Sequence, residues 1–382
     1  MVHLQNDASS MNNISNIKSC YGCGVCAIVC AKKLISIELD HEGFYAPQIR
    51  NLEQCTDCGL CTRVCAYAHD EALKDATPPQ GYAAWSNDAG TRRSCSSGGV
   101  GYEIGRSLLS KGNKLCGVRF DAHSNKAMHY VASTLEEWAP SMGSKYIQSY
   151  TVDAFRSIDR KGHYLVTGTP CQIDSFRRYL RMFNAEDNFV LMDFFCHGVP
   201  SKRTWDKYFS QVRKKIGAVA SASWRSKENG WDDSWVMRLQ GCDGSQYVSY
   251  RSQGDTFYQL FLGNQCLGKA CYARCKYKAL NSAADIRIGD LWGTTYQNNK
   301  EGVSALIGLT EKGKSVIAET EGIERVAHDI ETIIEGQMKQ NLSYPSIMRP
   351  MQLFLSRTRV PLSIQALLSK YTNKFKNRLN IP

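Results

Sequence analysis

The sequence predicts a protein of two parts, a small α+β module near the N-terminus and a larger mixed α/β part after it. Eight of the 16 cysteines lie between Cys20 and Cys65, in two copies of the same spacing. From residue 114 onward, short apolar strands alternate with helical segments and glycine-rich loops, which is typical of a sheet covered by helices. A further cysteine triplet, Cys266, Cys271 and Cys275, follows this alternation.

The two N-terminal cysteine runs predict iron–sulfur clusters. Both have the spacing C-x2-C-x2-C-x3-C, as in bacterial ferredoxins, where three cysteines bind one [4Fe–4S] cluster and the fourth binds the other. A zinc site would need two separated pairs of ligands, and disulfides would need an oxidising compartment. We therefore expect a ferredoxin-like module over residues 17–74. Its expected ligands are Cys20, Cys23, Cys26 and Cys65 for one cluster, and Cys55, Cys58, Cys61 and Cys30 for the other.

Composition and targeting signals indicate a globular protein of the cytoplasm. A chain of 382 residues has room for about two or three domains. Its N-terminus has no basic region followed by an apolar core, so we expect no signal peptide. The most apolar stretch, Phe189–Cys196, is too short to span a membrane and contains Asp193.

The positive charge of the chain is concentrated at its C-terminal end. The net charge is +11, and residues 349–382 contain seven Lys/Arg and no Asp/Glu. We expect a basic helical tail that packs on the protein's own core, contacts anionic lipid at the membrane surface, or binds an acidic partner. No nucleic-acid-binding motif accompanies the charge, so no nucleic-acid partner is expected. The apolar face of the tail is expected to hold Leu362, Leu367, Leu368, Tyr371 and Phe375, with Lys370, Lys374 and Arg378 on another face.

The order of elements follows from the hydrophobic pattern. Residues 34–39 and 44–49 predict a hairpin between the cysteine runs, and the Pro- and Gly-containing segment 75–81 predicts a linker. The rest divides into 82–160 and 161–348, followed by the tail at 349–382. Strands are expected at 114–120, 127–132, 163–168, 189–195, 286–292 and 303–309, a β-rich insertion at 219–251, and helices at 171–183, 201–216, 257–262 and over most of the chain beyond 309.

A glycine-rich loop precedes a predicted helix at residues 95–109. The glycines Gly99, Gly101 and Gly105 superficially resemble a dinucleotide fingerprint. Residues 91–95 before them are no buried strand, so a nicotinamide site of the Rossmann type is not expected. Ser96, Ser97 and the adjacent backbone amides could instead hold flavin phosphates at the start of the helix.

The triplet Cys266, Cys271 and Cys275 predicts a third [4Fe–4S] cluster, completed by one cysteine from another loop. Cys196 is the preferred fourth ligand and Cys171 the alternative. A zinc site that includes His197, or free buried thiols, are the other interpretations. The cysteines expected to have no ligand role are Cys95, Cys116 and Cys242.

Several of these pieces, in order over roughly residues 18–350, resemble the coenzyme F-420 hydrogenase/dehydrogenase beta-subunit family, in the version with an N-terminal two-cluster ferredoxin module. The matching pieces are Ser96-Ser-Gly-Gly99, Gly143-Ser-Lys-Tyr-Ile-Gln-Ser149, Thr167-Gly-Thr-Pro-Cys-Gln-Ile173, Phe195-Cys-His-Gly-Val-Pro-Ser201 and the cysteine triplet followed by Ala284-Asp-Ile-Arg-Ile-Gly-Asp-Leu-Trp-Gly293.

The resemblance implies a flavin, FAD, beside a [4Fe–4S] cluster in the α/β part. The implied flavin-binding residues are Ser96, Ser97, Gly98, Gly99, Ser144, Lys145 and Tyr146, and the implied cluster ligands are Cys196, Cys266, Cys271 and Cys275. The sequence departs from the family pattern in having three residues between Cys271 and Cys275 where two are expected. The exact ligand set is therefore open.

Together these features predict an iron–sulfur flavoprotein oxidoreductase. A low-potential donor such as a ferredoxin would reduce the clusters, and the flavin would reduce or oxidise a small molecule. The alternative is an electron-transfer subunit that docks on a partner subunit and has no substrate site of its own. A zinc-stabilised nucleic-acid binder is a third and weaker interpretation. The sequence identifies neither the substrate, nor a catalytic residue, nor whether coenzyme F-420 is used.

Overall fold

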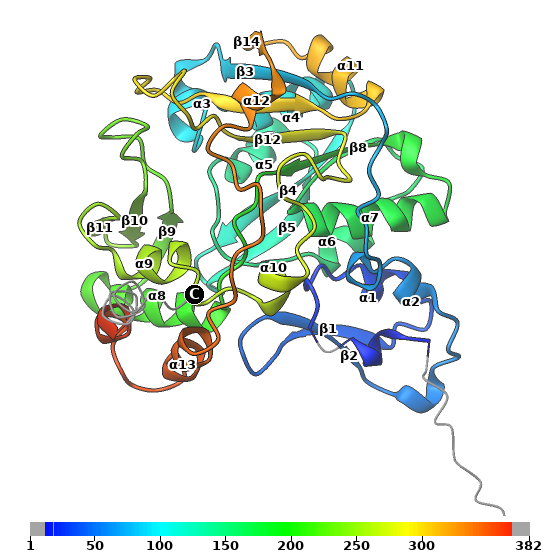
Figure 1. Cartoon of the computed structure of the whole chain (residues 1–382), viewed down its shortest axis with the longest axis horizontal. Coiled ribbons are helices and arrows are strands. Elements are labelled where there is room, and N and C mark those ends of the chain that lie inside the picture. Colours follow the sequence, from blue (N-terminus) through cyan, green and yellow to red (C-terminus); the bar gives the residue numbers. More distant parts are fainter. Residues whose placement is uncertain (1–11, 18, 369–382) are drawn as a thin grey trace, which may run out of the picture.

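The computed structural model describes residues 12–17 and 19–368 (Figure 1). The N-terminal module pairs β1 (Ile35–Leu39) with β2 (Tyr45–Ile49) in an antiparallel hairpin, as predicted. Each cysteine run turns into a short helix, α1 (Val25–Val29) or α2 (Leu60–Arg63). Gly24 and Gly59 precede these helices with φ of 77° and 71°, values that glycine adopts without strain.

One mixed sheet of nine strands organises the larger part (Figure 1). Its strands lie in the order β14 (Ile323–His328), β3 (Gln80–Ser86), β13 (Ser304–Gly308), β12 (Ile286–Asp290), β8 (Phe189–Phe194), β7 (Tyr164–Thr167), β4 (Lys114–Asp121), β5 (Lys126–Ala132) and β6 (Ser149–Tyr150). The four central strands β12, β8, β7 and β4 are parallel neighbours. Both predicted parts, 82–160 and 161–348, supply strands to this sheet.

Helices cover both faces of the sheet. Successive residues of a strand point to opposite faces, so each strand contributes side chains to two cores. Leu115 and Cys116 of β4 are both fully buried, yet they belong to different apolar cores. One core includes α4 (Val100–Ser110), α5 (Leu135–Trp138) and α11 (Glu311–Glu319). The opposite core includes α6 (Val152–Ser157), α7 (Pro170–Met182), α12 (Ile330–Ile333) and α1 of the N-terminal module. The module therefore shares the core of the larger part.

A second, smaller sheet lies beside the first. It has the order β11 (Gln246–Tyr250), β10 (Val236–Gly241) and β9 (Val219–Ser223), and it packs with α8 (Lys202–Ile216) and α9 (Thr256–Leu262). Its core is aromatic, with the rings of Trp205 and Trp224 4.8 Å apart. The predicted β-rich insertion and both helices are confirmed. The remaining helices include α3 (Ala89–Ser94), α10 (Lys269–Ala273) and α13 (Met348–Leu355).

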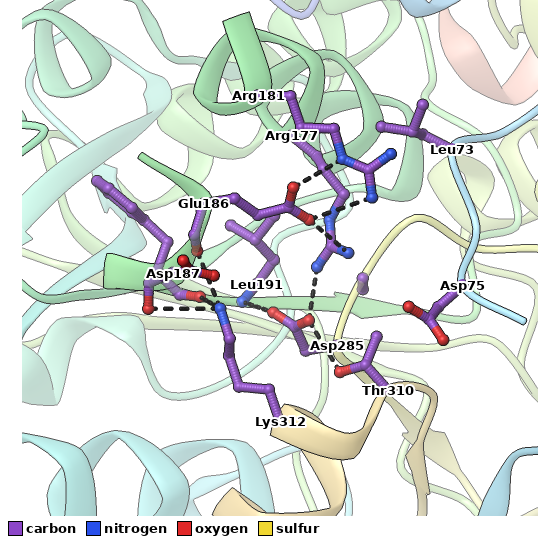
Figure 2. A network of polar contacts seen from close by, with 12 residues as sticks. Leu73, Asp75, Arg177, Arg181, Glu186, Asp187, Leu191, Asp285, Thr310 and Lys312 are labelled. Atoms are coloured by element: carbon purple, nitrogen blue, oxygen red, sulfur yellow. Dashed lines mark hydrogen bonds and ion pairs between the residues drawn. The ribbon is translucent and has the colours of Figure 1, made fainter. Parts of the chain in front are cut away.

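A buried polar network fixes the junction of α7, β8 and β12 (Figure 2). The Asp285 carboxylate accepts hydrogen bonds from the Arg177 guanidinium at 2.6 Å, the Leu191 amide at 2.7 Å and the Thr310 hydroxyl at 3.0 Å. Arg177 also pairs with Glu186 at 3.1 Å. Because each carboxylate oxygen has a partner, this buried charge can be kept inside the fold.

Two strands differ from the predicted pattern. Residues 75–79 of the predicted linker 75–81 contain no helix or strand, but β3, which was not predicted, begins at Gln80. The chain beyond 309 was expected to be mostly helical, but β14 lies at Ile323–His328 and pairs with β3. No helix among the described residues is long and apolar enough to cross a membrane.

The described start of the basic tail packs on the protein. Arg349 is fully buried and forms an ion pair with Glu42 of the N-terminal module at 2.7 Å. Leu362 is buried, whereas Leu367 and Leu368 are 51% and 40% exposed, so only part of the predicted apolar face packs on the protein. The predicted tail residues Lys370, Tyr371, Lys374, Phe375 and Arg378 lie outside the described residues.

Candidate functional site

A cavity of about 490 Å³ opens where the parallel strands β7 and β8 end. The loops that follow these strands, at Thr167–Cys171 and Phe194–Val199, form part of its wall. The carboxyl edge of a parallel sheet is the usual place for a ligand in an α/β fold. The volume lies within the range of cofactor and small-molecule sites. We call this space the main cavity.

The predicted flavin loops meet in the main cavity. Six of the seven predicted residues line it: Ser96, Ser97, Gly99, Ser144, Lys145 and Tyr146. The two loops are joined directly, because the Ser144 amide donates to the Ser96 hydroxyl at 2.8 Å. Gly98 packs away from the cavity, where its amide donates to the Ser304 hydroxyl at 2.9 Å. A Cβ at this position would lie 2.4 Å from the Ala84 carbonyl oxygen, so the sheet itself requires glycine here.

Two basic residues that the sequence did not single out hold these loops. The Arg225 guanidinium donates to the Ser96 carbonyl and the Tyr146 hydroxyl, both at 3.3 Å, and pairs with Asp290 at 3.0 Å. It lies 4.7 Å from the Trp235 ring, within cation–π distance. Lys227 donates to the Ser97 carbonyl at 2.6 Å. Both follow the insertion strand β9, and no motif in the sequence marks them.

Lys145 supplies an amine to the wall of the main cavity. Its Nζ donates to the carbonyl oxygens of Pro140 and Met142, both at 2.8 Å. Burial lowers the pKa of Lys145 to about 7, with the nearby Cys95 acting in the opposite direction. An anionic group in the cavity would favour the protonated amine, so the site suits a phosphate.

Six cysteines line the same cavity: Cys20 of the N-terminal module, Cys95 beside the flavin loop, and Cys171, Cys196, Cys271 and Cys275. The last four include two members of the predicted triplet and both candidates for its fourth ligand. The thiols of Cys171 and Cys196 both lie close to Cys271, whose charge raises the pKa of each of them. Burial raises the pKa of Cys196 to about 12, offset in part by the Lys278 ammonium, and raises that of Cys271 to about 11. Iron would stabilise these thiolates, because a metal deprotonates a coordinating thiol.

Cys266 lies elsewhere. It is fully buried in the aromatic core of the smaller sheet, together with Leu267 and Tyr272. Burial raises its pKa to about 12, and its polar neighbours are Thr204 and the Ser201 backbone rather than another cysteine. The structure therefore brings Cys171 to the other three cysteines and leaves Cys266 out. His197 lines the cavity with its ring 5.1 Å from that of Phe261.

A second cavity lies inside the N-terminal module. Its four cysteines are those predicted to bind one cluster: Cys20, Cys23, Cys26 and Cys65. Burial raises the pKa of Cys20 to about 12 and that of Cys65 to about 11, and the charge of Cys23 adds to both. Ile14, Ile37 and Pro47 provide apolar walls. Four buried thiols in an apolar pocket fit a [4Fe–4S] cluster.

The other predicted set lies toward the outside of the module. Cys61 is buried, Cys30 and Cys55 are half-buried, and Cys58 is exposed. The Asn13 amide approaches the Cys55 sulfur at 3.8 Å. Within residues 12–17 and 19–368, no group of three or more His, Cys, Asp or Glu side chains converges on a single metal ion.

Two family models match the chain. Residues 19–68 match the family model for a 4Fe-4S dicluster domain. Residues 162–331 match the family model for the C-terminal part of the coenzyme F420 hydrogenase/dehydrogenase beta subunit. The larger part of the chain is therefore similar to this beta-subunit family. The resemblance found in the sequence is thereby confirmed, and all eight N-terminal cysteines fall within the dicluster match. The two matches together make the chain an iron–sulfur protein of an oxidoreductase family.

A solved structure is also similar to this chain. It is one chain in a xenon derivative of the F420-reducing [NiFe] hydrogenase complex from Methanosarcina barkeri. The two share 14% identity with a TM-score of 0.47, over 83% of this chain and 96% of that chain. A search of curated proteins gives no match.

Proposed function

We propose that the chain is an iron–sulfur flavoprotein that transfers electrons between a low-potential donor and a small molecule. One observation carries this proposal: the predicted flavin loops and a set of four cysteines line the same cavity. When bound, the clusters would supply single-electron transfer and FAD would couple it to two-electron chemistry.

The residues of the main cavity have distinct proposed roles. Lys145 and the Ser96–Ser97 loop would bind the anionic part of the flavin, with Arg225 and Lys227 holding that loop in position. The fourth cysteine of the third cluster would be Cys171, since Cys266 is separated from the cavity. Lys278, which donates to the Cys196 carbonyl at 2.9 Å, would add positive charge beside the cluster. The two-cluster module would accept electrons near the exposed Cys58.

The test is the cofactor content of anaerobically purified protein. We expect about twelve irons, as many sulfides and one FAD per chain, which corresponds to three clusters and one flavin. Protein that holds clusters but takes up no flavin on supplementation would exclude the flavoprotein. Stoichiometric zinc without sulfide would exclude the clusters as well.

A role beside a partner subunit is the second candidate, because the family description names a beta subunit. In that case the loaded chain would transfer electrons only in the presence of its partner. Co-purification from the native host, followed by activity assays with a ferredoxin as donor, separates the two. Membrane contact by the tail is a further proposal, to be tested by vesicle flotation of the full chain against a chain truncated after Pro361.

A further inference from the structure

Tyr21 stands between the two cavities. It lines the main cavity and also the cavity of the N-terminal module. Among the described residues that line either cavity, only Cys20 and Tyr21 line both. Cys20 is a proposed ligand of the first cluster, so Tyr21 is the first side chain beyond that cluster toward the main cavity.

The position of the Tyr21 ring is fixed from several sides. Its hydroxyl donates to the Arg274 carbonyl oxygen, next to the proposed ligand Cys275. Its ring meets the edges of Tyr67 at 5.3 Å and Tyr277 at 5.8 Å. Its carbonyl oxygen accepts from the Gln148 amide at 3.0 Å. Contacts from the module and from the larger part therefore hold one conformation of the ring.

The Tyr21 ring forms part of the wall between the two cavities. It packs against the rings of Tyr67 and Tyr277, and protein interiors are packed as densely as organic crystals. Both ends of the Tyr21 residue are held. Its backbone directly follows the proposed ligand Cys20, and its hydroxyl contacts the loop that contains the proposed ligand Cys275. Such a wall gives a continuous path of atoms from one set to the other.

We propose that Tyr21 is the path by which an electron passes from the cluster held by Cys20, Cys23, Cys26 and Cys65 to the cluster held by Cys171, Cys196, Cys271 and Cys275. This inference rests on the proposed function. One electron leaves the first cluster, which is thereby oxidised by one electron, and enters the second cluster, which is thereby reduced by one electron. Tyr21 keeps its proton and is neither oxidised nor reduced, so its role is one of positioning and contact.

A competing path runs through Ser175. This residue lies one helical turn after Cys171 on α7, and its hydroxyl accepts from the Ala66 amide at 3.0 Å. It also contacts the thiol of Cys23. A path through Ser175 would bypass the ring of Tyr21 completely, so variants at the two positions distinguish the paths.

The experiment follows the order in which the clusters of the loaded full chain become reduced. We call the cluster held by Cys171, Cys196, Cys271 and Cys275 the inner cluster. Reduced ferredoxin is the donor, because a protein cannot enter the main cavity and reduce the inner cluster directly. Samples are freeze-quenched at set times and the electron paramagnetic resonance signal of each cluster is recorded. The variants are Tyr21→Leu, Tyr21→Phe and Ser175→Ala. The matched control is Tyr150→Leu, which removes an aromatic ring that packs against Tyr45 and lines neither cavity.

In Tyr21→Leu we expect the N-terminal clusters to be reduced at the wild-type rate and the inner cluster to be reduced severalfold more slowly. Tyr21→Phe and Tyr150→Leu should behave as wild type, because both retain an aromatic ring at position 21. Wild-type transfer in fully loaded Tyr21→Leu, or slow transfer confined to Ser175→Ala, would overturn the proposal.

A measurement on the unmodified protein keeps the proposal testable if Tyr21→Leu does not retain its clusters. In the fully reduced state, the first and inner clusters should show magnetic coupling, since one side chain separates them. Absence of that coupling overturns the path. A protein that contains only two clusters refutes the proposed function instead, and iron and sulfide analysis identifies that case before any rate is measured.

Discussion

At the scale of single residues, Lys145 should make flavin binding depend on pH. Its pKa is lowered to about 7 by burial, so the amine is protonated below pH 7 and neutral above it. The affinity for FAD should therefore fall as the pH rises through 7. Lys145→Met should remove this dependence and weaken binding at pH 6 by about 2 kcal/mol, the value of a hydrogen bond to a charged group.

Fluorescence titration of flavin-depleted protein between pH 6 and 9 measures this effect. Lys111→Met is a matched control, because Lys111 pairs with Glu319 on the exposed surface rather than lining the cavity. Parallel pH profiles for wild type and Lys145→Met would contradict a contact between Lys145 and the flavin.

The choice between Cys171 and Cys266 is also a question of single residues. If Cys171 is the fourth ligand, Cys171→Ser should lose about a third of the iron and sulfide, corresponding to one of three clusters. Cys266→Ala should keep all of it and lose only about 1 kcal/mol of stability, as a small buried side chain. Iron and sulfide analysis with thermal unfolding measures both. Loss of iron in Cys266→Ala alone would restore the ligand set that the sequence suggested.

The sequence could not separate these two cysteines by spacing. Cys266 lies five residues before Cys271, but it precedes α10 and its side chain enters the aromatic core. Cys171 and Cys196 are 25 positions apart in the chain, yet they follow the adjacent parallel strands β7 and β8. The rule that consecutive strands of this kind lie side by side would have favoured Cys171.

At the scale of elements, the buried Arg225–Asp290 pair should support the fold of the insertion and of the flavin loop. The Arg225 side chain is fully buried and that of Asp290 is 16% exposed. Arg225→Met leaves a carboxylate unpaired in the interior and should lower the free energy of unfolding by about 3 kcal/mol. Arg238→Met is the control, because its pair with Glu228 is half-exposed and should contribute under about 1 kcal/mol. Equal losses in denaturant unfolding would contradict this difference.

Two strands show where element prediction failed for physical reasons. In β3, Gly81, Ala83 and Ala84 are small because other elements pack closely; a Cβ at Gly81 would lie 2.8 Å from Ile333. Such a segment lacks the apolar alternation that predicts a strand. In β14, a strand at the edge of the sheet, Ile323 is its one buried residue. By contrast, the central strands β7 and β8 are apolar except for Thr167 and Asp193, and they were predicted within two residues of their bounds.

At the scale of the whole molecule, the sequence predicted the N-terminal module but not how it docks. Besides the shared core, several docking contacts are hydrogen bonds from side chains of the larger part to the backbone of the module. Thr151 donates to the Cys23 carbonyl at 2.8 Å, and Lys276 donates to the Ala66 carbonyl at 2.7 Å. Backbone partners leave no pattern in the sequence, so a fixed relation between the cluster sites could not be predicted.

One ion pair joins the module to the C-terminal end of the chain and should depend on pH. Glu42 follows β1, and Arg349 lies on α13, 307 positions later. Burial raises the pKa of Glu42, but Arg349 and Lys269 outweigh it, so the net pKa lies below the usual value. The stabilisation is therefore complete above the ordinary pKa of glutamate and is lost as the pH falls through the lowered value.

Glu42→Gln should cost roughly 3 kcal/mol at pH 7, because it leaves the buried Arg349 guanidinium unpaired. The cost should shrink toward pH 3, where Glu42 of the wild type becomes protonated as well. Glu38→Gln in the same hairpin is the matched control, since its pair with Arg50 is exposed and 3.7 Å long. Denaturant unfolding at the two pH values measures the difference. Identical losses for Glu42→Gln and Glu38→Gln would mean that the module is held by its core contacts alone.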